Sequence, residues 1–90
     1  MVFLAKVVKK GVVSEFTTSK GEKLPKIDLV LAQGKERLLV TAFDKLALIV
    51  KDVEYDAADV YVCDISFSVV PGKQEGSMFQ NIRLNDIHDF

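Results

Sequence analysis

Apolar and polar residues alternate along several stretches of the chain, with apolar side chains at every second position. Such a period of two is typical of β-strands that bury one face and expose the other. In the segment 60–70, for example, Ile65, Phe67 and Val69 are separated by serines. The pattern predicts five strands, over residues 2–18, 26–32, 37–43, 60–70 and 78–85.

Polar segments that contain glycine connect these predicted strands, at residues 18–25, 33–35 and 71–77. Glycine adopts the positive φ that tight hairpin turns need, so each segment fits a turn or loop. Gly11 is different, because it lies inside the first predicted strand. A glycine at such a position usually marks a bulge or a sharp bend. We therefore expect one long, bent first strand that takes part in two sheets.

The stretch VTAFDKLA, residues 40–47, combines two periods. Apolar residues alternate as far as Phe43, and beyond Asp44 they recur at helical spacings. The change predicts a strand that runs directly into a helix over residues 44–52, with Asp44 as the N-cap. The apolar stripe of this helix consists of Leu46, Ile49, Val50 and Val53. A short helix of this kind can close one end of a barrel.

Three strands, a helix and two further strands form the element order of the OB-fold, a five-stranded Greek-key barrel. We therefore predict an all-β fold with one short helix, formed as a single domain by residues 1–90. A barrel also removes the open sheet edges that a small β-protein must protect. The predicted core contains Ile27, Leu29, Leu38, Val40, Ile65, Phe67, Ile82 and Leu84.

The composition is rich in apolar residues for so short a chain, at 49% of 90 residues. A small domain leaves much of its surface in contact with water, so an apolar excess favours self-association. We expect a homo-oligomer, either a dimer or a tetramer, joined through the first strand. On that strand, Phe3, Val8 and Val12 are the residues expected to face a partner.

The chain contains one cysteine, Cys63, which excludes an internal disulfide and fits a reducing, intracellular compartment. No apolar run reaches the roughly 18 residues of a membrane-spanning helix. The opening MVFLA lacks the basic leader of a signal peptide. We therefore expect a cytoplasmic protein without a membrane partner.

Charge is distributed unevenly, although the net charge is only −1. Residues 1–26 have six lysines and two glutamates, whereas residues 27–90 have six basic and eleven acidic side chains. Four of these acids lie between Glu54 and Asp64, a segment without a basic residue. Unevenly charged faces are common on small proteins. The more specific interpretation is a basic edge that meets an anion, with the acidic side turned away.

The segment VTAFDKLA resembles the third-strand-to-helix segment of bacterial and phage single-stranded DNA-binding proteins. That segment often has the pattern hydrophobic-x-Ala-Phe-x-Lys-x-Ala. The matching residues are Val40, Ala42, Phe43, Lys45 and Ala47. The opening KVVKKGVVSEFTTSKGEKLPKIDLVL is also similar to theirs, with an early glycine and a Thr/Ser-Lys-Gly loop between two strands. The resemblance covers most of the chain in order of elements, and it implies an OB-fold that binds single-stranded DNA without sequence preference.

A groove for single strands needs cations for the phosphates and flat side chains on which bases stack. The predicted contact residues are Lys20, Lys23, Lys26, Lys35, Arg37, Lys73 and Phe79. Phe16 and Phe43 also occupy outward positions. We expect Phe43 to pack beneath the start of the helix, and Phe16 to cover the barrel mouth or a subunit interface. Phe79 is favoured for stacking because its face also presents the polar residues Asn81 and Arg83.

No pattern in the chain predicts catalysis, a metal site or a cofactor. His88 is the one histidine, and Cys63 occupies a position that alternation buries. The glycines within residues 72–76 do not lie between a strand and a helix, as a phosphate-binding loop would require. We therefore predict that the protein is not an enzyme.

The chain ends in NDIHDF, which contains Asp86, Asp89 and Phe90. Proteins of the family that the chain resembles often end in acidic residues and phenylalanine, used to recruit replication proteins. The simpler interpretation is that the last strand ends near Asn85 and the chain frays beyond it.

Two functions from different classes remain open. The lysines and the VTAFDKLA segment favour a single-stranded DNA-binding protein in a phage, plasmid or replication context. The acidic isoelectric point of about 5.7 and the absence of tryptophan favour an OB-fold module for protein contact or assembly, without nucleic-acid affinity. RNA would use the same groove as DNA, so the sequence does not separate these two ligands.

Overall fold

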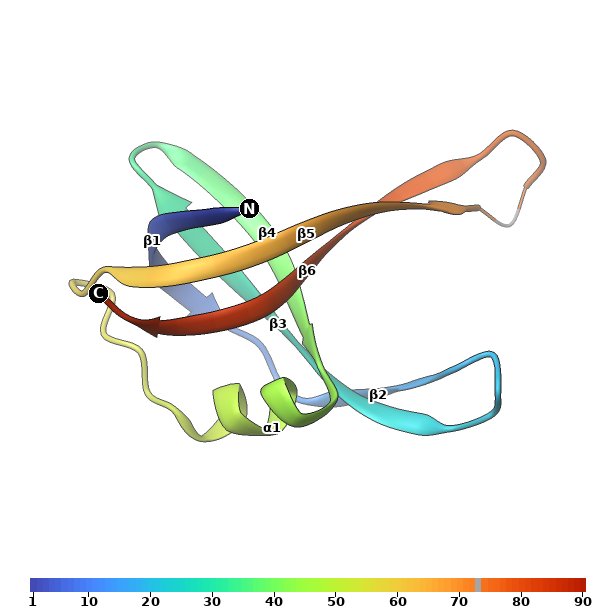
Figure 1. Cartoon of the computed structure of the whole chain (residues 1–90), viewed down its shortest axis with the longest axis horizontal. Coiled ribbons are helices and arrows are strands. Elements are labelled where there is room, and N and C mark those ends of the chain that lie inside the picture. Colours follow the sequence, from blue (N-terminus) through green and yellow to red (C-terminus); the bar gives the residue numbers. More distant parts are fainter. Residues whose placement is uncertain (73) are drawn as a thin grey trace.

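The computed structural model describes residues 1–72 and 74–90, and this part of the chain contains six strands and one helix (Figure 1). The sheet has the strand order β1-β5-β6-β4-β3-β2, and β1 also pairs with β3. This second pairing brings the sheet round on itself, so the predicted OB-fold architecture is confirmed. The elements are β1 (Val2–Lys10), β2 (Ser14–Thr17), β3 (Lys23–Gln33), β4 (Glu36–Phe43), α1 (Asp44–Asp52), β5 (Tyr61–Pro71) and β6 (Met78–Asp89).

The predicted first strand is divided at Gly11 into β1 and β2. Residues 2–5 of β1 pair with β5, and residues 6–10 pair with β3. The change of partner therefore lies before Gly11, and both partners belong to one sheet and not to the two sheets expected. The amide of Gly11 donates a hydrogen bond of 2.8 Å to the carbonyl oxygen of Asp28. A Cβ at position 11 would lie 3.2 Å from that oxygen, which explains the glycine at this close approach.

The core lies on the inward face that alternation predicts. Ile27, Leu29, Val40, Ile65 and Leu84 are all buried. Leu38 and Ile82 are partly buried and pack against this cluster, which also includes Ala47 and Val50 of the helix. The period of two therefore identified seven of the eight predicted core residues correctly.

The prediction that Phe67 belongs to the core is wrong, because 48% of its surface is exposed. Phe67 pairs with Ile82 near the place where β5 and β6 leave the barrel as a two-stranded hairpin. This hairpin extends to the upper right in Figure 1. Alternation continues along it, but the hairpin has no second layer to cover its inner face. Val69, two residues further along, is accordingly exposed as well.

Helix α1 begins and ends as predicted, but its first turn and its packing differ from the prediction. The helix buries Ala47 and Val50, whereas Ile49 and Val53 are exposed. The assignment of Asp44 as N-cap is wrong: Phe43 occupies that position, with φ −123° and ψ 154°, and no side chain caps the helix. Asp44 has a φ of 56° and lies inside the first turn. The chain therefore turns abruptly at Asp44 itself, in a conformation that aspartate tolerates better than most residues.

The last strand is longer than predicted, so the expected end near Asn85 is wrong. Strand β6 continues to Asp89, which pairs with Tyr61 at the start of β5. The sequence DIHDF has no continuous alternation, and backbone pairing with β5 maintains the strand instead. The beginning of β3 also lies earlier than predicted, at Lys23, because it pairs with Thr17 of β2.

The C-terminal end of α1 is held by a lysine from a distant strand. The Nζ atom of Lys10 donates hydrogen bonds to the carbonyl oxygens of Lys51 at 2.9 Å and Val53 at 2.7 Å, with a longer contact to that of Val50 at 3.4 Å. These carbonyls lie at the negative end of the helix dipole, where a cation is stabilising. Lys10 therefore has a structural role and joins β1 to the helix.

Replacing Lys10 by methionine is expected to lower the free energy of unfolding by about 1–2 kcal/mol, because the carbonyls lose a charged donor while the aliphatic chain is kept. Urea unfolding followed by circular dichroism measures the change. Lys6→Met is the matched control, since Lys6 is an exposed residue of the same strand. Equal stability of the Lys10 and Lys6 variants would contradict the proposed role of Lys10.

Candidate nucleic-acid interface

The outward face of β3 and β4 presents a mixture of basic, polar and apolar side chains. Residues that face inward on β3 include Ile27 and Leu29, so alternation turns Lys26 and Asp28 outward. Cross-strand pairs between the two strands lie on this outward face. These pairs are Lys26 with Phe43, Asp28 with Thr41, and Val30 with Leu39.

A pocket of about 260 Å³ lies at one end of this face. Its lining residues are Phe16, Leu24, Phe43, Asp44 and Arg83. The rings of Phe16 and Phe43 meet edge to face, with centroids 4.9 Å apart and an interplanar angle of 71°. The guanidinium carbon of Arg83 lies 5.5 Å from the centroid of Phe43, within cation–π range. Aromatic surface and a cation thus occur side by side, the combination that single-strand binding needs.

Two hairpins flank this pocket. Phe16 and Leu24 pair across the β2–β3 hairpin, and Arg83 belongs to the β5–β6 hairpin. Both hairpins extend toward the right in Figure 1, one above and one below the barrel. In OB-folds, the corresponding face and loops are the usual place for oligonucleotides and oligosaccharides. The topology therefore places this aromatic cluster where an OB-fold can receive a chain-like ligand.

A second pocket, of about 240 Å³, lies further along the same face. Its lining residues are Lys9, Gly11, Asp28, Val30 and Leu39. Leu39 and Phe43 are four residues apart on β4, or about 13 Å along a strand. We call the surface of these two pockets, together with Lys26 and Thr41 between them, the β3–β4 groove.

The structure brings only part of the predicted contact set to this groove. Lys26 lies directly across from Phe43 on the outward face. Lys20 lies in the turn at the end of the β2–β3 hairpin. Lys23 belongs to the same hairpin, but alternation turns its side chain to the face opposite Leu24.

The remaining predicted contact residues are spread more widely. Lys35 and Arg37 lie at the β3–β4 turn, and Arg37 is six residues from Phe43, or about 20 Å along β4. An Arg37 Nη1 atom donates to the carbonyl oxygens of Gly34 at 3.1 Å and Glu36 at 3.0 Å. Lys73 lies outside the described residues.

Phe79 is exposed on β6, and alternation places it on the same face as Arg83. It lies four residues from Arg83, or about 13 Å toward the end of the β5–β6 hairpin. A ligand that contacts Phe43 and Phe79 together would therefore follow β6 along the hairpin.

Two basic residues of the groove, Lys9 and Arg83, were not among the predicted contacts. Arg83 lies an even number of residues from Phe79 on β6, so alternation alone indicated that both side chains face outward. Lys9 could not be placed from sequence, because a register shift between Val7 and Lys9 breaks the alternation there. The expectation that Phe43 simply packs beneath the helix also needs correction, since its ring lines the groove and contacts Phe16.

The acidic segment lies at the other end of the barrel. The stretch from Glu54 to Asp59 connects α1 to the start of β5, at the left of Figure 1. Strand β5 has 11 residues, so its start lies about 33 Å from the tip of the β5–β6 hairpin. The acidic segment 54–59 therefore lies far from the end of the β5–β6 hairpin.

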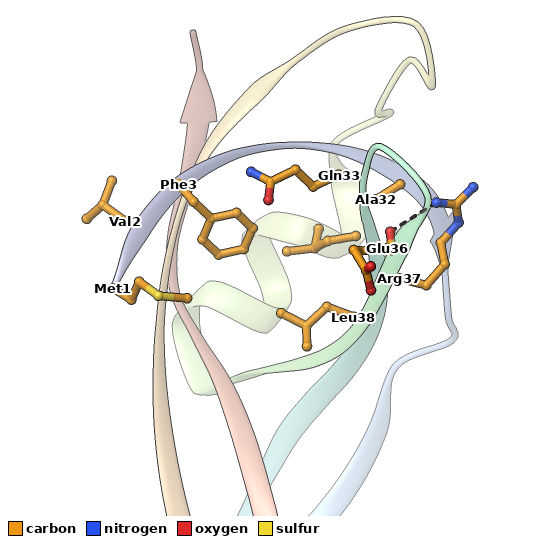
Figure 2. Close-up of a pocket in the computed structure, with 9 residues that line it drawn as sticks. Met1, Val2, Phe3, Ala32, Gln33, Glu36, Arg37 and Leu38 are labelled. Carbon is orange, nitrogen blue, oxygen red and sulfur yellow. Dashed lines mark hydrogen bonds between the residues drawn. The ribbon is translucent and has the colours of Figure 1, made fainter.

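A different cavity, of about 340 Å³, lies where the N-terminus meets the β3–β4 turn (Figure 2). Phe3 and Leu38 point into this cavity from opposite sides, and Met1 lies at its edge. Phe3 therefore faces the barrel end, whereas Val8 and Val12, also expected at a subunit contact, are exposed. The mainly apolar lining suits an apolar group better than a phosphate.

The cysteine and the histidine do not form a reactive pair. Cys63 is fully buried and pairs with Ile87, whereas His88 pairs with Val62 and so faces the opposite side of the sheet. Burial raises the pKa of Cys63 to about 11, and the charge of Asp86 adds to this effect. The thiol is therefore protonated at neutral pH and is a poor nucleophile.

Tyr55 also has a raised pKa. Burial raises the pKa of Tyr55 to about 12, with smaller contributions from Tyr61, Cys63 and Asp89. Its ring packs edge to face on Tyr61, with centroids 5.1 Å apart. This aromatic pair closes the barrel beside the acidic segment.

Among residues 1–72 and 74–90, no group of three or more His, Cys, Asp or Glu side chains is arranged to hold a metal ion. Helix α1, the single helix in the same part of the chain, is too short to cross a bilayer.

Comparisons with known proteins find similarity in structure alone. No family model matches the chain, and no curated protein matches it in sequence. The second OB-fold domain of replication protein A from Methanococcus maripaludis is similar, with a TM-score of 0.62 and 22% identity; the match covers 98% of this chain and 80% of that one. The SSB domain of a Synechococcus protein has the same TM-score of 0.62 at 16% identity, covering 98% and 91% of the two chains. These likenesses establish the OB-fold.

Proposed function

We propose that this protein binds single-stranded DNA without sequence preference, in the cytoplasm and in a replication, phage or plasmid context. The observation that carries the proposal is the cluster of Phe16, Phe43 and Arg83 beside Lys26, on the face between two protruding hairpins. The two similar structures support it by analogy, since one belongs to replication protein A and the other is an SSB domain.

The groove offers both kinds of contact that such binding needs. Exposed aromatic rings stack on bases whatever their identity, and each stacked base contributes about 1–3 kcal/mol. Lysine and arginine neutralise phosphates and release counterions, which gives affinity without sequence information. Phe43 and Phe79 are the proposed stacking residues, and Lys26 and Arg83 the central phosphate contacts.

The other cations are proposed as phosphate contacts at the ends of the path. A strand that leaves the groove along the β2–β3 hairpin meets Lys20 at the turn and would reach Lys23 on the other face of the hairpin, and one that follows β4 meets the β3–β4 turn. The complete proposed contact set is Lys20, Lys23, Lys26, Lys35, Arg37, Lys73, Phe79, Phe43, Arg83 and Lys9.

The test is fluorescence anisotropy with labelled oligo-dT over a range of salt concentrations. If about three to five phosphates are neutralised per subunit, the slope of log K against log salt should lie between about −2 and −4. Oligo-rU under the same conditions determines whether RNA is accepted equally. No measurable binding of either strand at low salt would refute the proposal.

The second candidate function is protein contact or assembly without nucleic-acid affinity. The outer face of β1 favours it, because Val2, Leu4 and Val8 are exposed there and Val60 lies beside them. This face is also the proposed contact in a homo-oligomer. A dimer or tetramer mass in light scattering, together with absent DNA binding, would favour this second function.

A further inference from the structure

A carboxylate lies in the middle of the proposed DNA-binding face. Asp28 is exposed on the outward side of β3 and lines the 240 Å³ pocket of the groove with Lys9, Val30 and Leu39. A negative charge at this place repels phosphates, so it does not serve the neutralisation of a DNA backbone. If Asp28 contributes to binding, it must therefore contact a part of the strand other than the phosphates.

The orientation of the Asp28 side chain is held by a neighbouring strand. The hydroxyl of Thr41 donates a hydrogen bond of 2.7 Å to Asp28 Oδ1. Within the described residues, the two ion pairs involve Asp64 and Asp86, so Asp28 has no cation at salt-bridge distance there. Its second oxygen, Oδ2, has no hydrogen-bond donor in the same part of the chain. The carboxylate is therefore positioned as an open acceptor that faces the groove.

The neighbours of Asp28 make a surface that suits a base rather than a phosphate. Leu39 is 60% exposed and lies across from Val30, so the two form an apolar platform next to the carboxylate. Gly11 leaves the pocket open on one side, because its backbone packs against Asp28 without a side chain between them. A base that lies on Leu39 and Val30 would direct its hydrogen-bonding edge toward Asp28.

An ionised carboxylate only accepts hydrogen bonds, so it distinguishes bases by the donors that they offer. The Watson–Crick edge of guanine has two adjacent donors, N1–H and the N2 amino group, which match the two oxygens of a carboxylate. Thymine has one N–H between two carbonyl oxygens, and those oxygens are repelled by the negative charge. Adenine and cytosine each offer one amino group next to an acceptor nitrogen.

We infer that Asp28 gives the groove a preference for guanine at one position of an otherwise nonspecifically bound strand. The inference rests on the proposed function, because it assumes that bases lie in the β3–β4 groove. In this arrangement the phosphates follow Lys9 and Lys26 at the rim, and the base edge meets Asp28 at the floor.

The test compares the repeating strands d(GT)8 and d(IT)8 with dT16 in competition anisotropy. Inosine has the guanine ring without the N2 amino group, so stacking is kept and one donor is lost. A bidentate pair of hydrogen bonds raises the affinity for guanine at least about fivefold over a base that cannot form both bonds. Half of the binding registers of d(GT)8 place guanine at the site. We therefore expect d(GT)8 to bind about threefold or more tightly than d(IT)8.

The variant Asp28→Asn should bind all three strands with similar affinity and should bind dT16 no more weakly than the unmodified protein, because a repulsive charge is removed. Circular dichroism checks that this variant is folded. Equal binding of d(GT)8 and d(IT)8 by the unmodified protein would overturn the inference and leave the proposed function intact. Tighter binding of d(GT)8 than of d(IT)8 by the Asp28→Asn variant would also overturn the inference. Failure to bind any of the three strands would refute the proposed function, and the inference with it.

Discussion

Replacing Leu29 by alanine is expected to lower the free energy of unfolding by about 2–5 kcal/mol, the usual range for a fully buried leucine. Leu29 has no exposed surface and belongs to the central cluster of the barrel. Its position on β3 pairs it with Val40 of β4 and Lys10 of β1. The two β-strands that hold it leave little room for the cavity to collapse, so the loss should be large. Urea unfolding monitored by circular dichroism measures it.

The matched control is Leu39→Ala on the neighbouring strand. Leu39 is the same residue type in the same sheet, but 60% of its surface is exposed. We expect its loss to change stability by no more than about 0.5 kcal/mol. A domain of this size has a total stability of roughly 5–15 kcal/mol, so the difference between the two variants is easily measured. Equal effects of the two substitutions would show that the proposed inward and outward faces of the sheet are wrong.

The second large effect is expected from the double variant Lys26→Gln with Arg83→Gln. Both side chains lie on the groove face, one across from Phe43 and the other over its ring. Loss of two phosphate contacts should make the salt slope less steep by about 1.4, using the coefficient for single strands. Over the tenfold range from 1 M to 0.1 M salt, this change in slope corresponds to about 25-fold weaker binding of the double variant at 0.1 M. The loss should be equal for all sequences, because phosphate contacts do not distinguish bases.

The control for this variant changes the same number of charges elsewhere. Lys6→Gln with Lys51→Gln removes two exposed lysines, one on the outer side of β1 and one on α1. Because net charge changes equally in the two double variants, a difference between them reports the position of the charges. Titration of oligo-dT by anisotropy at several salt concentrations separates the slope from the affinity. If both double variants weaken binding equally, DNA is not held at the β3–β4 groove.

Local sequence was sufficient for the element order, the strand faces and the fold. The alternation that buries Ile27 and Leu29 and turns Lys26 outward follows from the pleat of a strand, which any pairing partner preserves. The change of period at Phe43 likewise determined where the helix begins. These features depend on residues near one another in the chain, so a pattern of polar and apolar positions contains them.

Tertiary structure alone decided which alternating residues have something to pack against. Phe67 has the pattern of a core residue, yet it is exposed because β5 and β6 extend past the barrel. Asp44 has the sequence of an N-cap, yet the tight turn from β4 into α1 gives it a left-handed backbone. Lys10 has the sequence of a surface cation, yet it lies at the C-terminal end of a helix 40 residues later in the chain.

The candidate site was divided in the same way between local pattern and tertiary structure. Alternation placed Lys26, Phe43 and Arg83 on outward faces, but their meeting depends on pairing between β4 and β6, whose register no local pattern specifies. Lys23 and Arg37 are basic like Lys26, and only the geometry of the sheet separates them from the aromatic cluster. The sequence by itself therefore determined the kind of residue that faces outward, whereas contacts between distant strands decided which of those residues share a groove.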